Sequence, residues 1–380
     1  MKEFTRRDMM KLMAGTGLAA LTAPLSGCGT SSSSAAEPVV LRVPFGPTPV
    51  TQMGQTVYGY ELYIGKTLSL GLSVSKVEIL ADGALVKTYE GTELSQCLIK
   101  KVDPFSAEEA LFTGRNYSVL FAWPVLNSSS PVPTQFSHRV FFSDGQIAEG
   151  GSAAVTTGTT LIAPPVKGDR WWAANGTSNF DRHHRSALIE ISFKSTIAQR
   201  FATDWLQFGP DGRLSTGDGT HCTDFYCYGA NLLAVADGTV IEARDGIPDG
   251  VPPKNYAPNT LQNVFGNSVI LDIGGGRYAA YAHIIPGSVT VKIGDPVTQG
   301  QVIGKLGNSG NSTGPHLHFH LCNGRDGIAS EGLPFSFASY DLLGSMTIAD
   351  VENGKAWTPS GPPQVRTAEM PMLDQVVTLY

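Results

Sequence analysis

The sequence of 380 residues has few charged side chains and no excess of positive charge. Asp, Glu, Lys and Arg make up 16% of the chain, and 27 Lys and Arg stand against 33 Asp and Glu, for a net charge of −6. Proteins that bind nucleic acid through its phosphates depend on an excess of basic groups. The balance therefore gives no support to nucleic acid as a partner.

Long uninterrupted helices are not expected either, because the chain contains 43 glycines and 24 prolines. A helical bundle has no place for so many residues that break helices. The hydrophobic fraction of 42% is enough to bury a core, and the length allows about two domains at ~100–200 residues each. We expect an all-β chain of two domains with short strands and many turns.

Cysteine is scarce, with five residues at positions 28, 97, 222, 227 and 322. This number is too small for a disulfide scaffold in a chain of this size, so packing must hold the fold together. Cys222 and Cys227 lie close in sequence, and either a small loop disulfide or two free thiols fits that spacing. A zinc knuckle would require a second cysteine pair, which the sequence lacks.

The uncharged stretch at residues 12–25 is too short to span a bilayer, which takes ~20 residues. Arg6 and Arg7 stand shortly before it, and the arrangement resembles a twin-arginine export signal. The stretch ends in Leu-Ser-Gly-Cys at residues 25–28, which resembles the cleavage box of bacterial lipoproteins. We therefore expect residues 1–27 to be a signal peptide.

Cys28 would then become a lipidated amino terminus that attaches the protein to a membrane. Residues 28–38 contain a serine run without apolar periodicity and are expected to form a flexible tether. The predicted location is the bacterial cell envelope, with the protein exported, anchored by lipid and facing the periplasm or the cell wall.

Residues 39–162 alternate short β-rich runs with turns, a spacing typical of a β-sandwich that is immunoglobulin-like or related. Asp82-Gly83 between two such runs is the strongest hairpin signal in this half. His138 is the single histidine here, and without partner residues we expect it on a solvated strand face. Ala163-Pro164-Pro165 marks the expected domain boundary.

The second domain is expected at residues 166–340, followed by a C-terminal tail at 341–380 whose residues 376–379 dock as a strand. Trp171 and Trp172 at its start are expected to pack rather than to line a groove. Seven of the eight histidines lie in this half. His316, His318 and His320 alternate along one expected strand, so they share one face. That spacing favours a metal ligand beside an acid/base group.

Residues 307–319 read Gly-Asn-Ser-Gly-Asn-Ser-Thr-Gly-Pro-His-Leu-His-Phe and closely resemble the signature of the LytM-type zinc metallopeptidases, peptidase family M23. Tyr-Ala-His-Ile at residues 281–284 resembles a second motif of that family, and the resemblance covers about residues 181–335. It implies a small antiparallel β-sheet domain with a groove, one zinc ion, and hydrolysis of peptide bonds in the stem or cross-link peptides of peptidoglycan.

The same resemblance implies that His318 binds zinc, while His316 and His283 act on the attacking water and the developing oxyanion. Asn308 and Ser312 fall in the loop that shapes the groove. His320 stands where many relatives carry Glu, and it either supports a ligand from behind or lies on the surface.

Arg200 departs from the family pattern, because it occupies a position where relatives carry a histidine ligand four residues before Asp204. A guanidinium has no lone pair to give to zinc. A hairpin centred on Lys194 would place His184 opposite Asp204, and a register change of one residue would select His183 instead. We therefore expect zinc to be bound by His184, Asp204 and His318.

Two functions remain open at this stage. The first is a cell-envelope zinc metalloendopeptidase that keeps three protein ligands and an open position for water. The second is a metal-free module of the same fold that binds peptidoglycan or regulates another cell-wall hydrolase. Zinc content and digestion of cell wall separate the two.

Overall fold

The computed structural model describes residues 39–65, 71–101, 117–156, 158–179, 183–191, 194–254, 260 and 262–380, which belong to one compact unit. The predicted signal peptide, the tether and Cys28 lie outside these residues, so lipidation stays a prediction.

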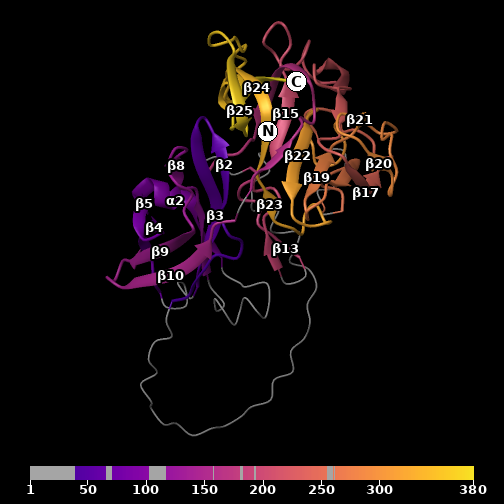
Figure 1. Cartoon of the computed structure of the whole chain (residues 1–380). Helices are drawn as coiled ribbons and strands as arrows, with labels where there is room; N and C mark the ends of the chain where they lie inside the picture. Colours follow the sequence, from indigo (N-terminus) through magenta and orange to yellow (C-terminus); the bar gives the residue numbers. More distant parts are fainter. Residues whose placement is uncertain are drawn as a thin grey trace, which may run out of the picture. The chain divides into compact units, whose positions relative to one another are not determined.

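The prediction of an all-β fold is confirmed. The α-helices among the described residues are short, namely α2 (Gly91–Cys97) and α4 (Ile348–Glu352), and a 3-10 helix, η1, covers Cys222–Asp224. Strands make up most of the ordered elements in Figure 1. In this part of the chain, no helix has both the length and the apolar character needed to cross a membrane.

The first part of the described chain forms two sheets. The six-stranded sheet contains β1 (Leu41–Arg42), β2 (Thr48–Gln52), β3 (Gln55–Gly65), β6 (Leu98–Lys101), β7 (Tyr117–Ala122) and β8 (Val125–Asn127). The four-stranded sheet runs in the order β10 (Ile147–Ala154), β9 (Gln135–Phe142), β4 (Val74–Ala81) and β5 (Ala84–Glu90). Tyr60 and Leu62 of the first sheet share a buried core with Ile79 and Val140 of the second. An immunoglobulin-like strand topology remains a prediction.

The hairpin expected at Asp82-Gly83 joins β4 to β5, with Ala81 paired to Ala84. Both turn residues have positive φ, 46° for Asp82 and 86° for Gly83. A two-residue turn with positive φ at both positions matches the right-handed twist of the strands it joins. This local signal was sufficient to locate the turn.

His138 contradicts its prediction, because the side chain is 1% exposed and belongs to the inward face of β9. Its Nδ1–H donates to the carbonyl of Gly151 at 3.1 Å, and its Nε2 accepts from the Tyr60 hydroxyl at 2.8 Å. Phe136 and Val140 lie on the same buried face of the strand. The alternation of the strand therefore places this histidine inside, where two hydrogen bonds satisfy it.

Burial of His138 predicts acid sensitivity of the sandwich. Burial lowers its pKa to about 4, whereas the unfolded chain has an ordinary value of ~6.5. The unfolded state therefore binds the extra proton first, and stability falls as the pH drops from about 6.5 to about 4, by about 3 kcal/mol for this group. Urea unfolding of the wild type and His138→Phe at neutral pH and near pH 4.5 measures the effect. The variant should lose less stability on acidification, and equal losses would contradict the assignment.

The rest of the described chain is dominated by a sheet of twelve strands (Figure 1). Its main path is β11 (Thr160–Ile162), β24 (Phe335–Ser345), β26 (Gln375–Leu379), β12 (Gly168–Ala174), β15 (Thr203–Gln207), β22 (Leu317–Cys322), β19 (Tyr278–Ala282), β18 (Ser268–Asp272), β17 (Gly238–Arg244) and β20 (Pro296–Val297). The strand β23 (Gly332–Leu333) pairs with β22, and β25 (Gln364–Glu369) pairs with β24. Two small ladders join β13 (Ile189–Ile191) to β14 (Lys194–Thr196) and β16 (Asn231–Leu233) to β21 (Val302–Lys305).

The register of the central strands places the candidate site. Asp204 of β15 pairs with Ala174 of β12 on one side and with His318 of β22 on the other. His318 in turn pairs with Ala282 of β19, the residue before His283. A row of paired residues that crosses β12, β15, β22 and β19 therefore contains Asp204 and His318 and ends beside His283.

The hairpin expected around Lys194 is wrong in its extent and register. The strand β14 ends at Thr196, and Thr196 pairs with Ile189, whereas a hairpin centred on Lys194 would pair it with Ser192. The chain then turns, with backbone hydrogen bonds inside residues 197–202, before β15 begins. Asp204 consequently pairs with two other strands, and the predicted ladder with His184 does not form.

The C-terminal segment joins the large sheet. The strand β26 pairs with both β12 and β24, so the prediction that residues 376–379 dock as a strand is confirmed. Trp171 is buried in the main core, and Trp172 packs against Phe208 while its indole N–H donates to the Met346 carbonyl at 2.9 Å. The expectation that these residues pack rather than line a groove is confirmed for Trp171, whereas Trp172 packs and also lines the pocket described below.

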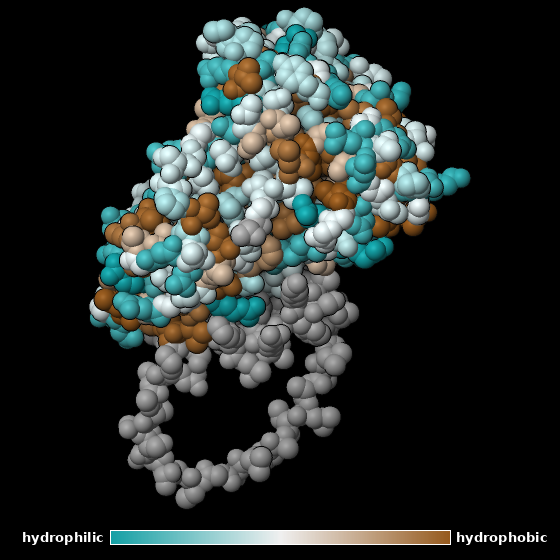
Figure 2. Space-filling view, viewed as in Figure 1, coloured by the Kyte–Doolittle hydropathy of each residue, from teal (hydrophilic) through white to brown (hydrophobic). Residues whose placement is uncertain are grey.

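Large exposed hydrophobic side chains are distributed over separate elements of the described chain. They include Leu85 in β5, Ile147 in β10 and Val365 in β25. Figure 2 shows brown residues in several places among teal and white ones on the face in view. Single exposed hydrophobic residues are normal on protein surfaces and indicate no particular partner.

Candidate metal centre

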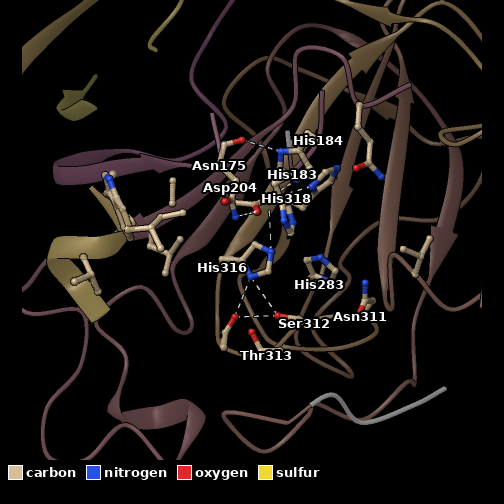
Figure 3. Close-up of a pocket in the computed structure, with 18 of the residues that line it drawn as sticks. Asn175, His183, His184, Asp204, His283, Asn311, Ser312, Thr313, His316 and His318 are labelled. Atoms are coloured by element: carbon tan, nitrogen blue, oxygen red, sulfur yellow. Dashed lines mark hydrogen bonds and ion pairs between the residues drawn. The ribbon is translucent and has the colours of Figure 1, made fainter. Parts of the chain in front are cut away.

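A pocket of about 350 Å³ opens where β12, β15 and β22 lie side by side. Its walls include five histidines and one buried carboxylate: His183, His184, His283, His316, His318 and Asp204. Figure 3 shows these side chains gathered around one space, although they come from segments far apart in the sequence. The pocket therefore concentrates most of the histidines of the chain at one place.

Asp204 is the centre of this group and is 3% exposed. Its Oδ1 lies 3.0 Å from Nδ1 of His318, 3.4 Å from Nε2 of His184 and 3.6 Å from Nε2 of His316. Its Oδ2 accepts a hydrogen bond from the Asn175 side-chain amide at 2.9 Å. Three imidazole nitrogens thus approach a single carboxylate oxygen.

The tautomer of His318 follows from a chain of hydrogen bonds behind it. Nε2 of His320 lies 2.9 Å from the Gly327 carbonyl, which can only accept, so this nitrogen carries the hydrogen. Nδ1 of a neutral His320 must then accept, and it lies 3.1 Å from Nε2 of His318, which donates. Burial lowers the pKa of His318 to about 3 and that of His320 to about 4, so both rings are neutral at neutral pH. The lone pair of His318 is therefore on Nδ1, facing Asp204.

This arrangement leaves two acceptors facing each other, because Asp204 is ionised. Burial alone would raise the pKa of Asp204, but the positive charge that His184 and His316 carry when protonated outweighs that effect and holds the pKa well below its usual range. Two buried acceptors 3.0 Å apart repel unless a cation lies between them. Donor atoms around a tetrahedral zinc at ~2.0–2.1 Å are themselves ~3.3 Å apart. The chemistry and spacing of these donors fit a zinc ion.

His184 supplies the next donor from the turn that follows β12. Its Nδ1 lies 2.8 Å from the backbone carbonyl of Asn175, which again can only accept, so Nδ1 carries the hydrogen in the neutral ring. Nε2 then holds the lone pair and faces Asp204. The side chain is buried, with 5% exposed. His184 therefore reaches Asp204 from a turn and not from the predicted ladder.

His183 also lies near this centre, at an exposed position. The donor atoms of His183, His184 and Asp204 lie within 4.8 Å of one another. The structure thus brings both histidines that the sequence offered to the same carboxylate. His184 is the buried one, and a backbone carbonyl fixes its tautomer, so it is the better preorganised ligand.

His283 and His316 lie beside the three donors, with ring centroids 4.6 Å apart. Nδ1 of His283 donates to the Ser309 carbonyl at 2.7 Å, and Nδ1 of His316 donates to the Gly314 carbonyl at 2.9 Å. In the neutral rings the lone pairs are therefore on Nε2. Burial, with His316 and His318 as further causes, holds the pKa of His283 well below its usual range. These two rings are placed to accept protons.

His283 has an unusual backbone conformation, with a φ of 64° directly after β19. Its N–H donates to the Phe265 carbonyl at 2.8 Å, and its carbonyl accepts from the Gly307 N–H at 2.9 Å. Residues held with positive φ often occur at functional sites, where surrounding contacts impose the conformation. The two backbone hydrogen bonds supply such contacts here.

The other predicted residues support the pocket. Asn308 is fully buried, donates to the Gly250 carbonyl at 3.0 Å and accepts from the Ser312 hydroxyl at 2.6 Å, so it holds the loop without lining the pocket. Ser312 lines the pocket. His320 is also fully buried, which excludes the surface alternative and places it behind His318.

Cys222 and Cys227 are free thiols in the structure, so of the two alternatives the loop disulfide is not formed. The Cys222 thiol donates to the Gly250 carbonyl at 3.2 Å, and the Cys227 thiol donates to the Pro315 carbonyl at 3.1 Å. Both cysteines therefore steady loops next to the pocket.

Some site residues had no signal in the sequence. Asn175 binds both Asp204 and His184, yet it follows an apolar run without any motif. Ile348 and Val351 of α4 line the pocket from more than 140 residues beyond Asp204. Only the pairing of β24 and β26 with the large sheet brings α4 to this place. Asparagine is common at the ends of strands, so the sequence alone gave no reason to predict Asn175 as a site residue.

Residues 219–329 match the family model described as Peptidase family M23. This segment of the chain is therefore similar to peptidase family M23. The matched M23 segment contains His283, His316, His318 and His320, and it begins after His184 and Asp204. The family match therefore covers His283, His316 and His318, whereas the place of His184 and Asp204 in the site is argued from geometry.

Two curated relatives are similar to parts of this chain. The glycyl-glycine endopeptidase ALE-1 of Staphylococcus capitis is 30% identical over 132 residues, which is 34% of this chain and 32% of that protein. The peptidoglycan DD-endopeptidase ShyA of Vibrio cholerae is 43% identical over 56 residues, 15% of this chain and 13% of that protein. The chain thus spans about a third or less of the length of these relatives.

Solved structures show a weaker likeness. The catalytic domain of lysostaphin from Staphylococcus simulans is 25% identical, covers 33% of this chain and 86% of that chain, and gives a TM-score of 0.21. A zinc-containing peptidase from Vibrio cholerae is 13% identical, covers 74% of this chain and 81% of that chain, and gives a TM-score of 0.25. At these scores the M23 assignment rests on the sequence match.

The position of His320 behind His318 predicts a change in the affinity of this candidate site for zinc. His320→Ala removes the acceptor that fixes the tautomer of His318, so zinc binding should weaken ~10–100-fold. His320→Gln can accept from His318 through its side-chain carbonyl and should retain more affinity. Titration against a chromophoric chelator measures both variants, with urea unfolding as the control for stability. Equal affinity of His320→Ala and wild type would exclude this role.

Proposed function

We propose that this chain is a zinc metalloendopeptidase that hydrolyses peptide bonds in peptidoglycan. One observation carries the proposal: the lone-pair nitrogens of His184 and His318 meet the ionised Asp204 at donor spacing, with both tautomers fixed by hydrogen bonds behind the rings. His283 and His316 lie beside this set and are not needed to complete it.

The proposed ligands are His184, Asp204 and His318. A zinc ion bound there would supply Lewis acidity, making a bound water more acidic and polarising the carbonyl of the scissile peptide. Two nitrogens and one carboxylate with an open fourth position form a ligand set typical of catalytic zinc. Arg200 takes no part in the set, because its guanidinium is bound elsewhere.

The acid/base work falls to His283 and His316. In its neutral form each ring donates its Nδ1–H to a backbone carbonyl, which leaves Nε2 able to accept a proton from the attacking water. Once protonated, the same Nε2–H can donate to the tetrahedral oxygen or to the departing amine. The carbonyl of Gly314 and the hydroxyl of Ser312 keep His316 oriented during this transfer.

The proposed substrate and location are supported by the names of the relatives and by the amino-terminal sequence. The names of the two curated relatives describe endopeptidases, one for glycyl-glycine bonds and one for peptidoglycan. We therefore assign the stem or cross-link peptides of peptidoglycan as substrate. The proposal includes export and attachment to the cell envelope through a lipid on Cys28, in keeping with the motif at residues 25–28.

The test uses the purified mature chain and isolated peptidoglycan. We expect one zinc per chain by elemental analysis, and soluble fragments with new amino termini and intact glycan bonds by mass spectrometry. Removal of zinc by a chelator should stop the release, and added zinc should restore it. A chain that contains no zinc and binds peptidoglycan without releasing fragments would instead establish the non-catalytic module.

A further inference from the structure

The segment that carries His184 is a turn, so something other than a strand ladder must fix its position. The next residue, Arg185, is 2% exposed and extends into the six-stranded sheet. Its Nη2 donates to the Tyr60 carbonyl at 2.8 Å and to the Ala122 carbonyl at 3.2 Å. Its Nη1 contacts Oε1 of Glu61. The residue beside the proposed ligand is thus held by strands β3 and β7.

Arg200 lies four residues before Asp204 and binds the same carboxylate. Its Nη2 lies 2.6 Å from Oε2 of Glu61 and 2.6 Å from Oε2 of Glu331, and its Nη1 donates to the Gly332 carbonyl at 3.1 Å. Gly332 begins β23, which pairs with β22, the strand of His318. Glu61 therefore binds the arginine that follows His184 and the arginine that precedes Asp204, and Arg200 in turn reaches β23 beside the strand of His318.

Because these charges are buried, the side chains that carry them must stay paired with one another. The residues Glu61, Arg185 and Arg200 are each at most 3% exposed. Burial alone would raise the pKa of Glu61, but the two arginines outweigh it and hold the pKa at about 2. An unpaired buried charge costs several kcal/mol, so each guanidinium must keep its partners. The turn before β13 and the turn before β15 have little freedom to move away from Glu61.

We propose that Glu61 is a positioning residue for the metal centre, holding Arg185 and Arg200 so that His184 and Asp204 stand at donor distance. The six-stranded sheet is then a functional part of the M23 site and not only a neighbouring domain. This proposal also gives Arg200 a role. At the position where relatives carry a metal ligand, this chain carries an arginine that forms a buried ion pair with Glu61. The inference rests on the proposed zinc function.

The experiment measures zinc affinity in the full mature chain by competition with a chromophoric chelator. Glu61→Gln is expected to weaken zinc binding ~10–100-fold, the range found when groups that orient metal ligands are removed. The absorption spectrum of the cobalt-substituted protein should change in band position as the ligand geometry loosens. Measurements are made well below the unfolding temperature, with folding verified by circular dichroism.

Val140→Ala is the matched control. Val140 is buried in the core of the sandwich, and no hydrogen bond or ion pair joins its side chain to Glu61 or to the two arginines. Its truncation should therefore lower the stability of the fold and leave zinc affinity unchanged. Arg185→Lys decides the matter if Glu61→Gln does not fold, because it keeps the charge and loses the fork that reaches Glu61 and two carbonyls. It should also weaken zinc binding.

Unchanged zinc affinity in a folded Glu61→Gln or Arg185→Lys would overturn the positioning role. The role is overturned equally if Val140→Ala loses as much affinity as these variants at equal loss of stability. A wild-type chain without zinc would instead refute the proposed function itself, so the two failures are distinguishable.

Discussion

His184→Ala is expected to abolish stoichiometric zinc binding. The variant removes one of three donors and leaves Asp204 and His318 alone, and two ligands do not complete a structural or catalytic zinc site. The loss of affinity should exceed the ~10–100-fold that follows when only a supporting group is removed. Elemental analysis after dialysis against a weak chelator measures the retained zinc, and the chelator titration gives the change in affinity.

His183→Ala is the control that the chain itself offers. The two side chains are adjacent, and both have donor atoms near Asp204, but His183 is exposed whereas His184 is 5% exposed. We expect His183→Ala to retain its zinc. The reverse result, with zinc lost from His183→Ala and kept in His184→Ala, would transfer the ligand role to His183.

His316→Ala is expected to reduce the turnover of peptidoglycan by ~10²–10⁴-fold, the usual contribution of a general acid or base. Zinc should remain bound, because the three proposed donors are untouched. The rate of appearance of new amino groups from isolated peptidoglycan, at saturating substrate, gives the change in kcat. Elemental analysis of the same preparation shows whether the metal has stayed.

Two further variants sharpen this result. His283→Ala should have an effect of similar size, and the double variant should lose much less than the product of the two, because the rings act on one proton transfer. His221→Ala is the negative control, since that histidine is exposed and does not line the pocket. Loss of zinc from His316→Ala would make His316 a ligand and contradict the assignment.

The fold was predictable to the extent that its signals are local. Alternation of apolar residues and the Asp82-Gly83 turn each act over a few residues, and both appear in the structure. His138 shows that alternation also holds where a polar residue suggested otherwise. Phe136 and Val140, two residues before and two residues after it, indicate that this face of the strand is buried. The lack of polar partners nearby in the chain had suggested an exposed position instead.

The site was predictable only in part. The His-x-His strand and His283 belong to motifs within the M23 segment, so their contribution could be read from the residues. The approach of His184 to Asp204 was predicted from a ladder that does not exist, because the register of strands distant in sequence depends on tertiary packing. Glu61 and Arg200 are 139 positions apart in the sequence, and no sequence pattern predicts that they form an ion pair.

The backbone carbonyls behind the histidine rings have a kinetic consequence. Asn175, Ser309 and Gly314 each hold one ring from the protein side, and Gly327 does so through His320. The rings therefore take their final orientation when the chain folds, before any ion arrives. Loading with zinc should then be a single fast phase limited by encounter and dehydration, with no slow rearrangement following it.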